Sequence, residues 1–442
     1  MRRVLILGAG GRDFHDFQVV FRDDPTVRVV AFTAAQIPGI DDRRFPASLA
    51  GSAYPDGLPI RPQAQLEAII RDERVDDVVL SYSDLAHVDV MHLASRVLAA
   101  GAGFRFLSPT ETMLRSSRPV VAVCAVRTGC GKSQTARLIG RVLTDAGLRV
   151  VLVRHPMPYG DLEAMRVQRF ETLADIDAAH PTVEEREEYE EPVRLGLVMY
   201  AGVDYQAILG RAEAEADVIV WDGGNNDLPF FRPDLHVTVT DALRPGHELA
   251  SHPGETNLRM ADVVVVNKID SAHADDVTTV LADVAATNPT ATVVRAESPV
   301  TLDAGPPLEG RRVLVVEDGP TITHGGMPFG AGTVAALAAR AVVVDPRPHA
   351  VGTIAETFAR FPHIQKVLPA MGYGETQLAD LRATIEAVDC DAVVAGTPAD
   401  LGRLLDLAVP VRRVSYELRE VGEPTLADVL RPFIARWRDG IR

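Results

Sequence analysis

Residues 127–133 have the composition and the position of a phosphate-binding loop. The apolar run Val120–Val126 reads as a strand, the loop that follows contains Gly129 and Gly131, and a helical segment is expected from Gln134. In such a unit, backbone N–H groups and the positive end of the helix dipole attract phosphate. The residues predicted to bind a nucleoside triphosphate are Arg127, Thr128, Gly129, Cys130, Gly131, Lys132, Ser133 and Gln134.

Within this loop, Lys132 is predicted to contact the β- and γ-phosphates and Ser133 to ligate Mg²⁺. Only three of the 45 lysine and arginine residues are lysines, namely Lys132, Lys268 and Lys366. Because a lysine offers a compact ammonium group rather than a planar fork, its retention here favours a phosphate contact over a chance glycine turn. The strict motif has a glycine where this chain has Val126. The loop instead resembles the dethiobiotin-synthetase and nitrogenase-iron-protein variant, with Arg127 as its extra cation, predicted to be catalytic together with Lys132.

Two further strand ends are expected to complete the nucleotide site. The apolar segment Asp217–Trp221 ends at Asp222, which is predicted to be catalytic and to hold Mg²⁺ with Ser133. The strand Val263–Val266 leads to Asn267-Lys268-Ile269-Asp270, whose carboxylate can accept from the two N–H donors of guanine. Adenine lacks that donor pair, so Asn267, Lys268 and Asp270 favour GTP, although ATP remains open.

Cations and glycine loops elsewhere are candidates for handling a second phosphorylated group. His155 follows a predicted strand, with Arg166 and Arg169 nearby, and Arg347 follows a later strand. A solvated surface cation is the alternative for each of them. The glycine loop around His324, Gly325 and Gly326 and the loop Gly8–Arg12 could bind an anion or be plain turns. The acidic run Val183–Glu191 is interpreted as a solvated helix face.

Composition limits the class of protein. The formal net charge is −16, which argues against broad binding to nucleic acid or to an anionic membrane. No run approaches the roughly 18 apolar residues of a membrane span. The start of the chain is read as a first strand rather than a secretion signal. Three cysteines provide no disulfide framework, so a reducing cytoplasm is expected.

The elements that position these residues alternate between short apolar strands and helices, which predicts an α/β protein with parallel sheets. At 442 residues the chain is long enough for several domains. We predict an N-terminal Rossmann-like α/β domain over residues 1–117, a P-loop NTPase core over 118–305, and a C-terminal α/β domain over 306–442.

Taken together, the motifs resemble those of the predicted P-loop GTPase family of cyclic 2,3-diphosphoglycerate synthetases. The resemblance rests on segments spread over nearly the whole chain: Gly10–His15, Arg127–Ser133, His155–Asp161, Asp222–Asp227, Asn267–Asp270 and His324–Gly332. It implies an ATP- or GTP-dependent ligase that closes a phosphoanhydride in 2,3-bisphosphoglycerate. The acceptor would then contact His155, Arg166, Arg169, His324, Gly325, Gly326 and Arg347. The alternative is a regulatory or chaperone GTPase that acts on a protein partner, and a homo-oligomer is possible in either case.

Overall fold

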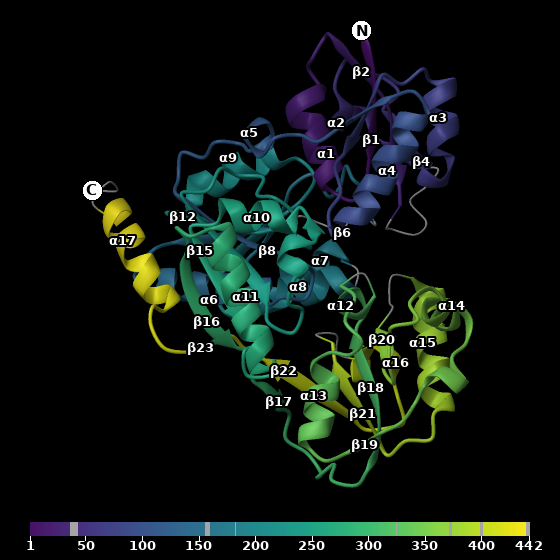
Figure 1. The fold of residues 1–442 in the computed structure, drawn as a ribbon, viewed down its shortest axis with the longest axis vertical. Helices are drawn as coiled ribbons and strands as arrows, with labels where there is room; N and C mark the ends of the chain where they lie inside the picture. Colours follow the sequence, from purple (N-terminus) through teal and green to yellow (C-terminus); the bar gives the residue numbers. More distant parts are fainter. Residues whose placement is uncertain are drawn as a thin grey trace.

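The protein is built around three large β-sheets that follow one another along the chain. A computed structural model describes residues 1–35, 43–154, 160–181, 183–323, 325–370, 374–397 and 401–438. Figure 1 shows the N-terminal sheet at the top, the central sheet below it, and the C-terminal sheet at the bottom. The expected α/β class with parallel sheets is confirmed.

The N-terminal sheet has six strands in the order β3-β4-β2-β1-β5-β7. Its middle strand β1 pairs in parallel with β2 and β5. The strands are β1 (Arg2–Leu7), β2 (Val27–Ala34), β3 (Arg44–Phe45), β4 (Leu58–Pro62), β5 (Asp77–Leu80) and β7 (Gly103–Arg105). A separate antiparallel pair, β6 (Leu85–Ala86) with β14 (Ser251–His252), joins this part of the chain to the central part.

The central sheet has nine strands in the order β10-β11-β9-β12-β8-β13-β15-β16-β23. Every residue of β8 is buried, as expected for a parallel strand covered by helices on both faces. All strands from β11 to β16 in this order run parallel, so the ends of β8, β9, β12 and β15 meet at one edge. The strands are β8 (Val120–Ala125), β9 (Val150–Val153), β10 (Gln168–Phe170), β11 (Val198–Ala201), β12 (Val218–Asp222), β13 (Leu235–Asp241), β15 (Val263–Asn267), β16 (Thr292–Glu297) and β23 (Arg419–Glu420).

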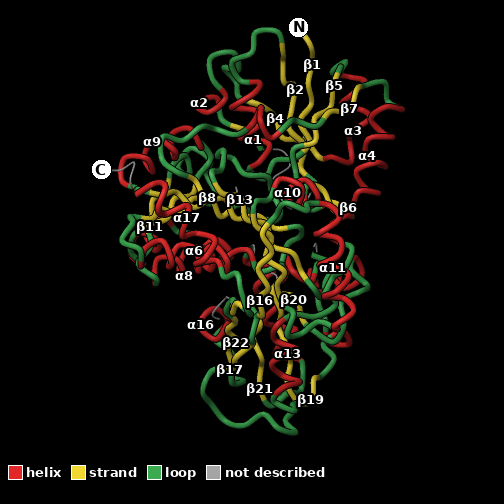
Figure 2. The backbone as a smooth tube through the Cα atoms, turned by 60° about the vertical axis from the view of Figure 1, so that its left-hand side comes forward, coloured by secondary structure: helices red, strands yellow, loops and turns green. Residues whose placement is uncertain are grey.

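The C-terminal sheet has the order β17-β22-β21-β18-β19, with β20 also paired to β18. Its strands are β17 (Val300–Leu302), β18 (Arg312–Asp318), β19 (Val342–Val343), β20 (Leu368–Ala370), β21 (Ala392–Gly396) and β22 (Val411–Tyr416). The view in Figure 2 shows β16 leading toward the sheet that holds β22 and β21.

The chain crosses between the central and C-terminal sheets twice. It leaves from β16 into β17 and returns from β22 into β23. At this crossing β16 pairs with β23 and β17 pairs with β22, both antiparallel. The final helix α17 (Leu426–Arg438) then packs against α6 (Lys132–Asp145) in the central core, through Leu426, Leu430 and Phe433. Residues 419–438 therefore lie with the central sheet, and not with the C-terminal unit in which the sequence interpretation placed them. The division into three domains is kept as a proposal.

Helices cover the faces of all three sheets. The remaining helices are α1 (Arg12–Asp16), α2 (Ala47–Ala50), α3 (Leu66–Asp72), α4 (His87–Ala99), α5 (Pro109–Thr112), α7 (Leu173–Ala179), α8 (Val183–Arg194), α9 (Tyr205–Glu215), α10 (Gly254–Met260), α11 (Ala274–Thr287), α12 (Gly319–Ile322), α13 (Ala331–Ala338), α14 (Gly352–Arg360), α15 (Glu375–Ala387) and α16 (Leu401–Leu405). Short helical turns are η1 (Phe17–Phe21), η2 (Gln63–Gln65), η3 (His247–Leu249) and η4 (Arg347–His349).

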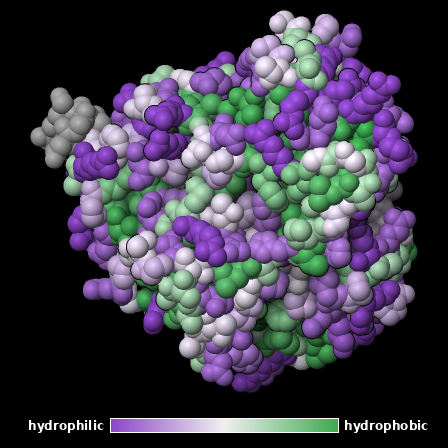
Figure 3. All heavy atoms as spheres, turned by 45° about the horizontal axis from the view of Figure 1, so that its top comes forward, coloured by the Kyte–Doolittle hydropathy of each residue, from purple (hydrophilic) through white to green (hydrophobic). Residues whose placement is uncertain are grey.

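On the face drawn in Figure 3, hydrophilic side chains are spread between smaller hydrophobic groups. None of the helices described is both long enough and apolar enough to cross a membrane.

Candidate nucleotide-binding site

The predicted phosphate loop joins β8 to α6, as expected. Helix α6 begins at Lys132, directly after Gly131, which has φ +105°. A Cβ atom at Gly131 would lie 2.3 Å from Asn267 Nδ2, so only glycine fits this backbone. The strand, the glycine loop and the helix N-terminus therefore have the arrangement that phosphate binding requires.

Lys132 and Asp222 form a buried ion pair beneath this loop. Lys132 Nζ lies 2.5 Å from Asp222 Oδ1, and Arg154 Nη1 lies 2.9 Å from Asp222 Oδ2. Burial alone would raise the pKa of Asp222, but the charges of Lys132 and Arg154 outweigh it and lower that pKa. Asp222 is therefore an ionised carboxylate at the edge of the sheet where the phosphates are expected.

The extra cation of the loop is held by the N-terminal part of the chain. Arg127 Nε lies 2.8 Å from Asp84 Oδ1, and both side chains are almost fully buried. Asp84 follows β5 and has φ +64°, a conformation that a residue with a side chain rarely adopts. The guanidinium of Arg127 is thus oriented by a carboxylate that sequence reasoning did not identify, because its partner lies 43 residues away.

The segment Asn267–Asp270 contacts the loop from the other side. Asn267 Nδ2 donates to Cys130 O at 2.8 Å, and Lys268 Nζ donates to Gly129 O at 2.6 Å. Lys268 also pairs with buried Asp241, which in turn pairs with Arg244. Arg244 donates to Thr128 O at 2.8 Å, so a network of buried charges fixes the loop backbone.

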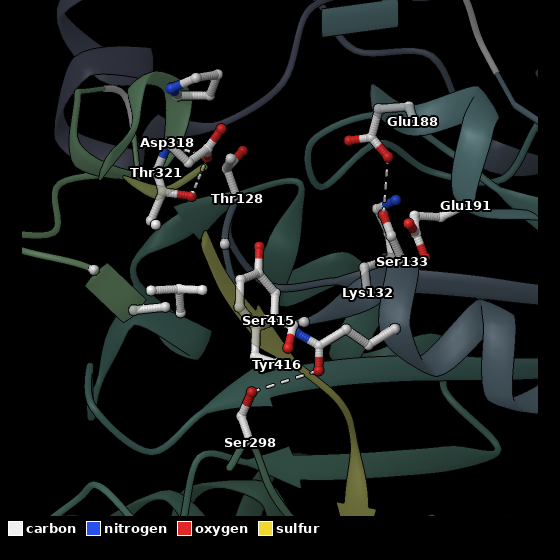
Figure 4. Close-up of a pocket in the computed structure, with 18 of the residues that line it drawn as sticks. Thr128, Lys132, Ser133, Glu188, Glu191, Ser298, Asp318, Thr321, Ser415 and Tyr416 are labelled. Carbon is white, nitrogen blue, oxygen red and sulfur yellow. Dashed lines mark hydrogen bonds between the residues drawn. The ribbon is translucent and has the colours of Figure 1, made fainter. Parts of the chain in front are cut away.

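Asp270 is exposed at the end of this segment, and its Oδ1 accepts from the backbone N–H of Ser298 at 3.1 Å. Ser298 Oγ lies 3.4 Å from Gln134 Oε1, the contact marked in Figure 4. The residues expected to bind the nucleotide therefore lie around one site.

We predict that Asp270→Asn weakens binding of GTP more than that of ATP. Loss of a charge-assisted pair of hydrogen bonds to guanine should cost about 1.5–3 kcal/mol of binding free energy. Isothermal titration with each nucleotide measures the difference. Asp275→Asn, an exposed aspartate at the start of α11, is the matched control. Equal small losses for both nucleotides would contradict a role of Asp270 in reading the base.

A cavity of about 850 Å³ opens in front of the phosphate loop. The N-terminal part contributes Gly10 and Asp84 to its lining, and the C-terminal part contributes Asp318 and Tyr416 from its sheet and Thr321 from α12. Figure 4 shows Asp318 and Thr321 beside Thr128, with Glu188 across the cavity above Ser133. Because β18 also ends here, the cavity lies where the carboxyl ends of two parallel sheets meet, a usual place for ligands in such folds.

Both glycine loops proposed as anion sites already hold a carboxylate of the chain itself. Asp13 Oδ2 accepts from the N–H of Gly10 at 2.8 Å, and Oδ1 accepts from the N–H of Gly11 at 3.2 Å. Glu317, which is buried, accepts from the N–H groups of Gly330 and Gly332 at 2.9 and 3.0 Å. Burial raises the pKa of Glu317 to about 7, and its hydrogen bonds limit that rise. In the described parts of the two loops, these N–H groups are therefore taken by carboxylates of the chain and not left for an anionic acceptor, contrary to the expectation from sequence.

The structure also corrects the predicted positions of three arginines. Arg166 pairs with Asp204, and Arg169, which lies on the edge strand β10, pairs with Glu215 of α9. Arg347 is half exposed and pairs with Asp345 at 2.5 Å. None of the three lines the cavity, because each is held by a nearby carboxylate elsewhere.

The other residues of that predicted acceptor site have mixed outcomes. Gly325 lies near the site, since its carbonyl accepts from Arg244 at 2.6 Å, and Gly326 adopts φ +70°. His155 and His324 fall outside the described residues.

The sequence interpretation missed the role of the acidic run. Helix α8, which contains it, lines the cavity, and Glu188 pairs with Arg154 at 2.8 Å. Asp318 and Tyr416 were also missed, because they reach the cavity from the C-terminal sheet. For Asp318, the only available signal was its place at the end of an apolar strand.

Comparisons with known proteins agree with this geometry. The sequence model of the family described as CobW/HypB/UreG, nucleotide-binding domain, matches residues 210–295, which include β12 and β15. Arginine synthetase ArcE of Thermococcus kodakarensis is 56% identical over 430 residues, covering 97% of this chain and 96% of the relative. The chain belongs to the arginine synthetase ArcE family. It is thus a nucleotide-binding P-loop protein of a synthetase family, in line with the class expected from the motifs.

Two more distant similarities bear on that expectation. Cyclic 2,3-diphosphoglycerate synthetase of Thermococcus sibiricus is 19% identical over 263 residues, covering 55% of this chain and 59% of the relative. Among solved structures, LpxK of Aquifex aeolicus in complex with ATP has a TM-score of 0.40 and 12% identity, and the match covers 84% of this chain and 99% of LpxK. The resemblance noted from the motifs therefore has a distant counterpart, whereas the full-length relative is an ArcE protein.

Proposed function

We propose that the protein is a nucleoside-triphosphate-dependent synthetase that forms arginine. The observation that carries this proposal is a group of carboxylates that line the cavity around the phosphate loop. Asp318 and Glu417 contribute to this group from the C-terminal part, and Glu188 contributes from α8. Carboxylates in this position can hold a cationic product such as a guanidinium group by charge-assisted hydrogen bonds. The 56% identity to arginine synthetase ArcE supports the same substrate class.

The proposed reaction uses phosphoryl transfer to activate an oxygen. In a ureido amino acid with the side-chain length of arginine, the ureido oxygen attacks the γ-phosphorus and the nucleoside diphosphate leaves. Ammonia then adds to the ureido carbon, the C–O bond breaks, and phosphate leaves with the original oxygen. The products are arginine, nucleoside diphosphate and phosphate, so atoms and charges balance. This chemistry needs positioning and charge neutralisation, which the site provides.

The residues of the chain have distinct parts in this proposal. Lys132 and the N–H groups of the loop bind the β- and γ-phosphates, and Arg127, oriented by Asp84, binds the transferred group. Ser133 Oγ and Asp222 Oδ2 lie 3.2 and 2.9 Å from the same atom, Arg154 Nη1, so a positive charge fits between them. These hard oxygen donors suit Mg²⁺, which usually takes its other ligands from phosphates and water. Bound Mg²⁺ would neutralise charge on the transferred phosphoryl group.

The test is a reconstitution with defined substrates. Purified protein is incubated with ATP or GTP, Mg²⁺, ammonium and the ureido amino acid carrying ¹⁸O in its ureido group. Arginine and phosphate are then measured by mass spectrometry. We expect arginine only when all components are present, with ¹⁸O found in the phosphate. Arginine formed without ¹⁸O-labelled phosphate would contradict the proposed activation step.

A parallel assay addresses the second candidate, cyclisation of 2,3-bisphosphoglycerate. The distant relative, 19% identical, favours that reaction, but the occupied glycine loops do not. If 2,3-bisphosphoglycerate stimulates turnover and the ureido substrate does not, the proposal of arginine synthesis fails. Slow hydrolysis that no small acceptor changes, but that a protein partner accelerates, would instead indicate a regulatory or chaperone GTPase.

A further inference from the structure

Arg154 occupies the centre of the site although no motif marks it. It follows β9, and its side chain is only 9% exposed. Its guanidinium contacts three groups: Asp222 at 2.9 Å, Ser133 Oγ at 3.2 Å and Glu188 at 2.8 Å. Figure 4 shows Glu188 on α8 directed at Ser133, joined to it by a contact of 3.5 Å.

These contacts define a compact set of charges at the phosphate site. Lys132 and Arg154 supply two positive charges, and Asp222 and Glu188 supply two negative ones. Two carboxylates therefore hold the cations that a triphosphate would need. If Asp222 held Mg²⁺, Arg154 would lose its electrostatic partner at that carboxylate. The guanidinium already reaches Ser133 Oγ, which lies beside the expected β- and γ-phosphates, so phosphate oxygens can replace the carboxylates as its partners.

We propose that Arg154 binds the γ-phosphate of the nucleotide, and that Glu188 holds its guanidinium in the site when no triphosphate is bound. This inference rests on the proposed nucleotide site and adds a residue to it. An arginine suits this role because its planar fork can contact two phosphate oxygens at once. Arg154, which follows β9, would then contact the transferred phosphoryl group on the side opposite Lys132. The acidic helix α8 then has a function, since it positions that cation.

A purely structural role makes the opposite prediction. If Arg154 only neutralises Asp222, it competes for that carboxylate with the Mg²⁺ that would accompany the triphosphate. Its removal would then strengthen triphosphate binding. If Arg154 binds the γ-phosphate, its removal weakens triphosphate binding and leaves diphosphate binding almost unchanged.

The experiment measures affinities of ADP, GDP and the non-hydrolysable analogues of ATP and GTP, with Mg²⁺, by isothermal titration calorimetry. For Arg154→Ala we expect triphosphate affinity to fall about tenfold or more, while diphosphate affinity changes less than about twofold, because only the triphosphate carries the charge that Arg154 contacts. Arg154→Lys should recover part of the loss, since the charge is kept but the fork is not.

Arg149→Ala is a matched control, because Arg149 pairs with Asp217 between the same two strands, β9 and β12, at their opposite end. It should leave all affinities unchanged. Glu188→Gln should tighten triphosphate binding in the wild-type background and have no effect in the Arg154→Ala background. Thermal unfolding of each variant identifies any that fail to fold, and Arg154→Lys then serves in place of Arg154→Ala.

Unchanged or tighter triphosphate binding by folded Arg154→Ala would overturn the inference. A wild-type protein that binds no nucleotide would instead overturn the proposed function itself. The two failures are therefore distinguishable without any measurement of arginine synthesis.

Discussion

Replacing Lys132 with alanine is expected to abolish nucleotide turnover while the fold persists. Lys132 Nζ lies 2.5 Å from Asp222 at the start of α6, where the β- and γ-phosphates are expected. Loss of this cation removes charge stabilisation that is needed most in the transition state, so kcat should fall by about 10²–10³ or more. Phosphate release under saturating nucleotide measures the effect.

Lys366→Ala provides the control for that variant. Lys366 is the third lysine of the chain and lies exposed, away from the cavity. Its replacement should leave kcat unchanged. If folded Lys132→Ala protein turned over nucleotide as fast as Lys366→Ala, the loop would not be the catalytic site.

The second large effect concerns stability, at Asp241. Its carboxylate is buried and pairs with both Lys268 and Arg244. Asp241→Asn leaves these two cations without their counter-charge, and breaking a buried pair of this kind costs about 3–5 kcal/mol of unfolding free energy. Urea unfolding at pH 7, followed by circular dichroism, measures the loss. Asp217→Asn, which breaks a more exposed pair with Arg149, should cost less than about 1 kcal/mol.

The same carboxylate makes stability depend on pH. Burial alone would raise the pKa of Asp241, but the charges of Lys268 and Arg244 lower it to about 2 from a usual value of 3.8. A lowered pKa in the folded state stabilises the fold above pH 4, and this contribution is lost as the pH falls toward 2. Asp241→Asn should therefore lose less stability than the wild type between pH 4 and pH 2. An identical pH dependence in both proteins would contradict the assignment.

Local sequence was sufficient to predict the nucleotide-facing half of the site. A strand, a glycine loop and a helix start follow one another in residues 120–134, and Asp222 and Asn267 end two other strands of the same parallel sheet. Parallel strands bring such ends to one edge, so a linear pattern predicts their proximity. The roles proposed for Ser133 and Asp222 as metal ligands stay predictions.

The acceptor-facing half could not be predicted, because it depends on partners distant in the sequence. From the sequence alone, an arginine near phosphate-binding motifs cannot be distinguished from a phosphate ligand. Only the packing of β10 and α9 shows that Arg169 pairs with Glu215. The acidic run looked like a solvated face for the same reason. Its partner Arg154 lies 34 residues earlier, and only packing of α8 over the loop brings the two together.

The connection between the central and C-terminal sheets constrains how the cavity can change shape. Two adjacent antiparallel strands cross there, β16 into β17 and β22 into β23, and residues 298 and 416–418 between them line the cavity. A single covalent linker permits rotation about any axis, whereas two strands that cross side by side leave fewer free rotations. The paired strands therefore restrict motion of the C-terminal sheet relative to the central sheet more than one linker would. Ser298 and Tyr416 lie at this crossing and also line the cavity. A ligand that contacts both of them would therefore be affected directly by any change in the orientation of the two sheets.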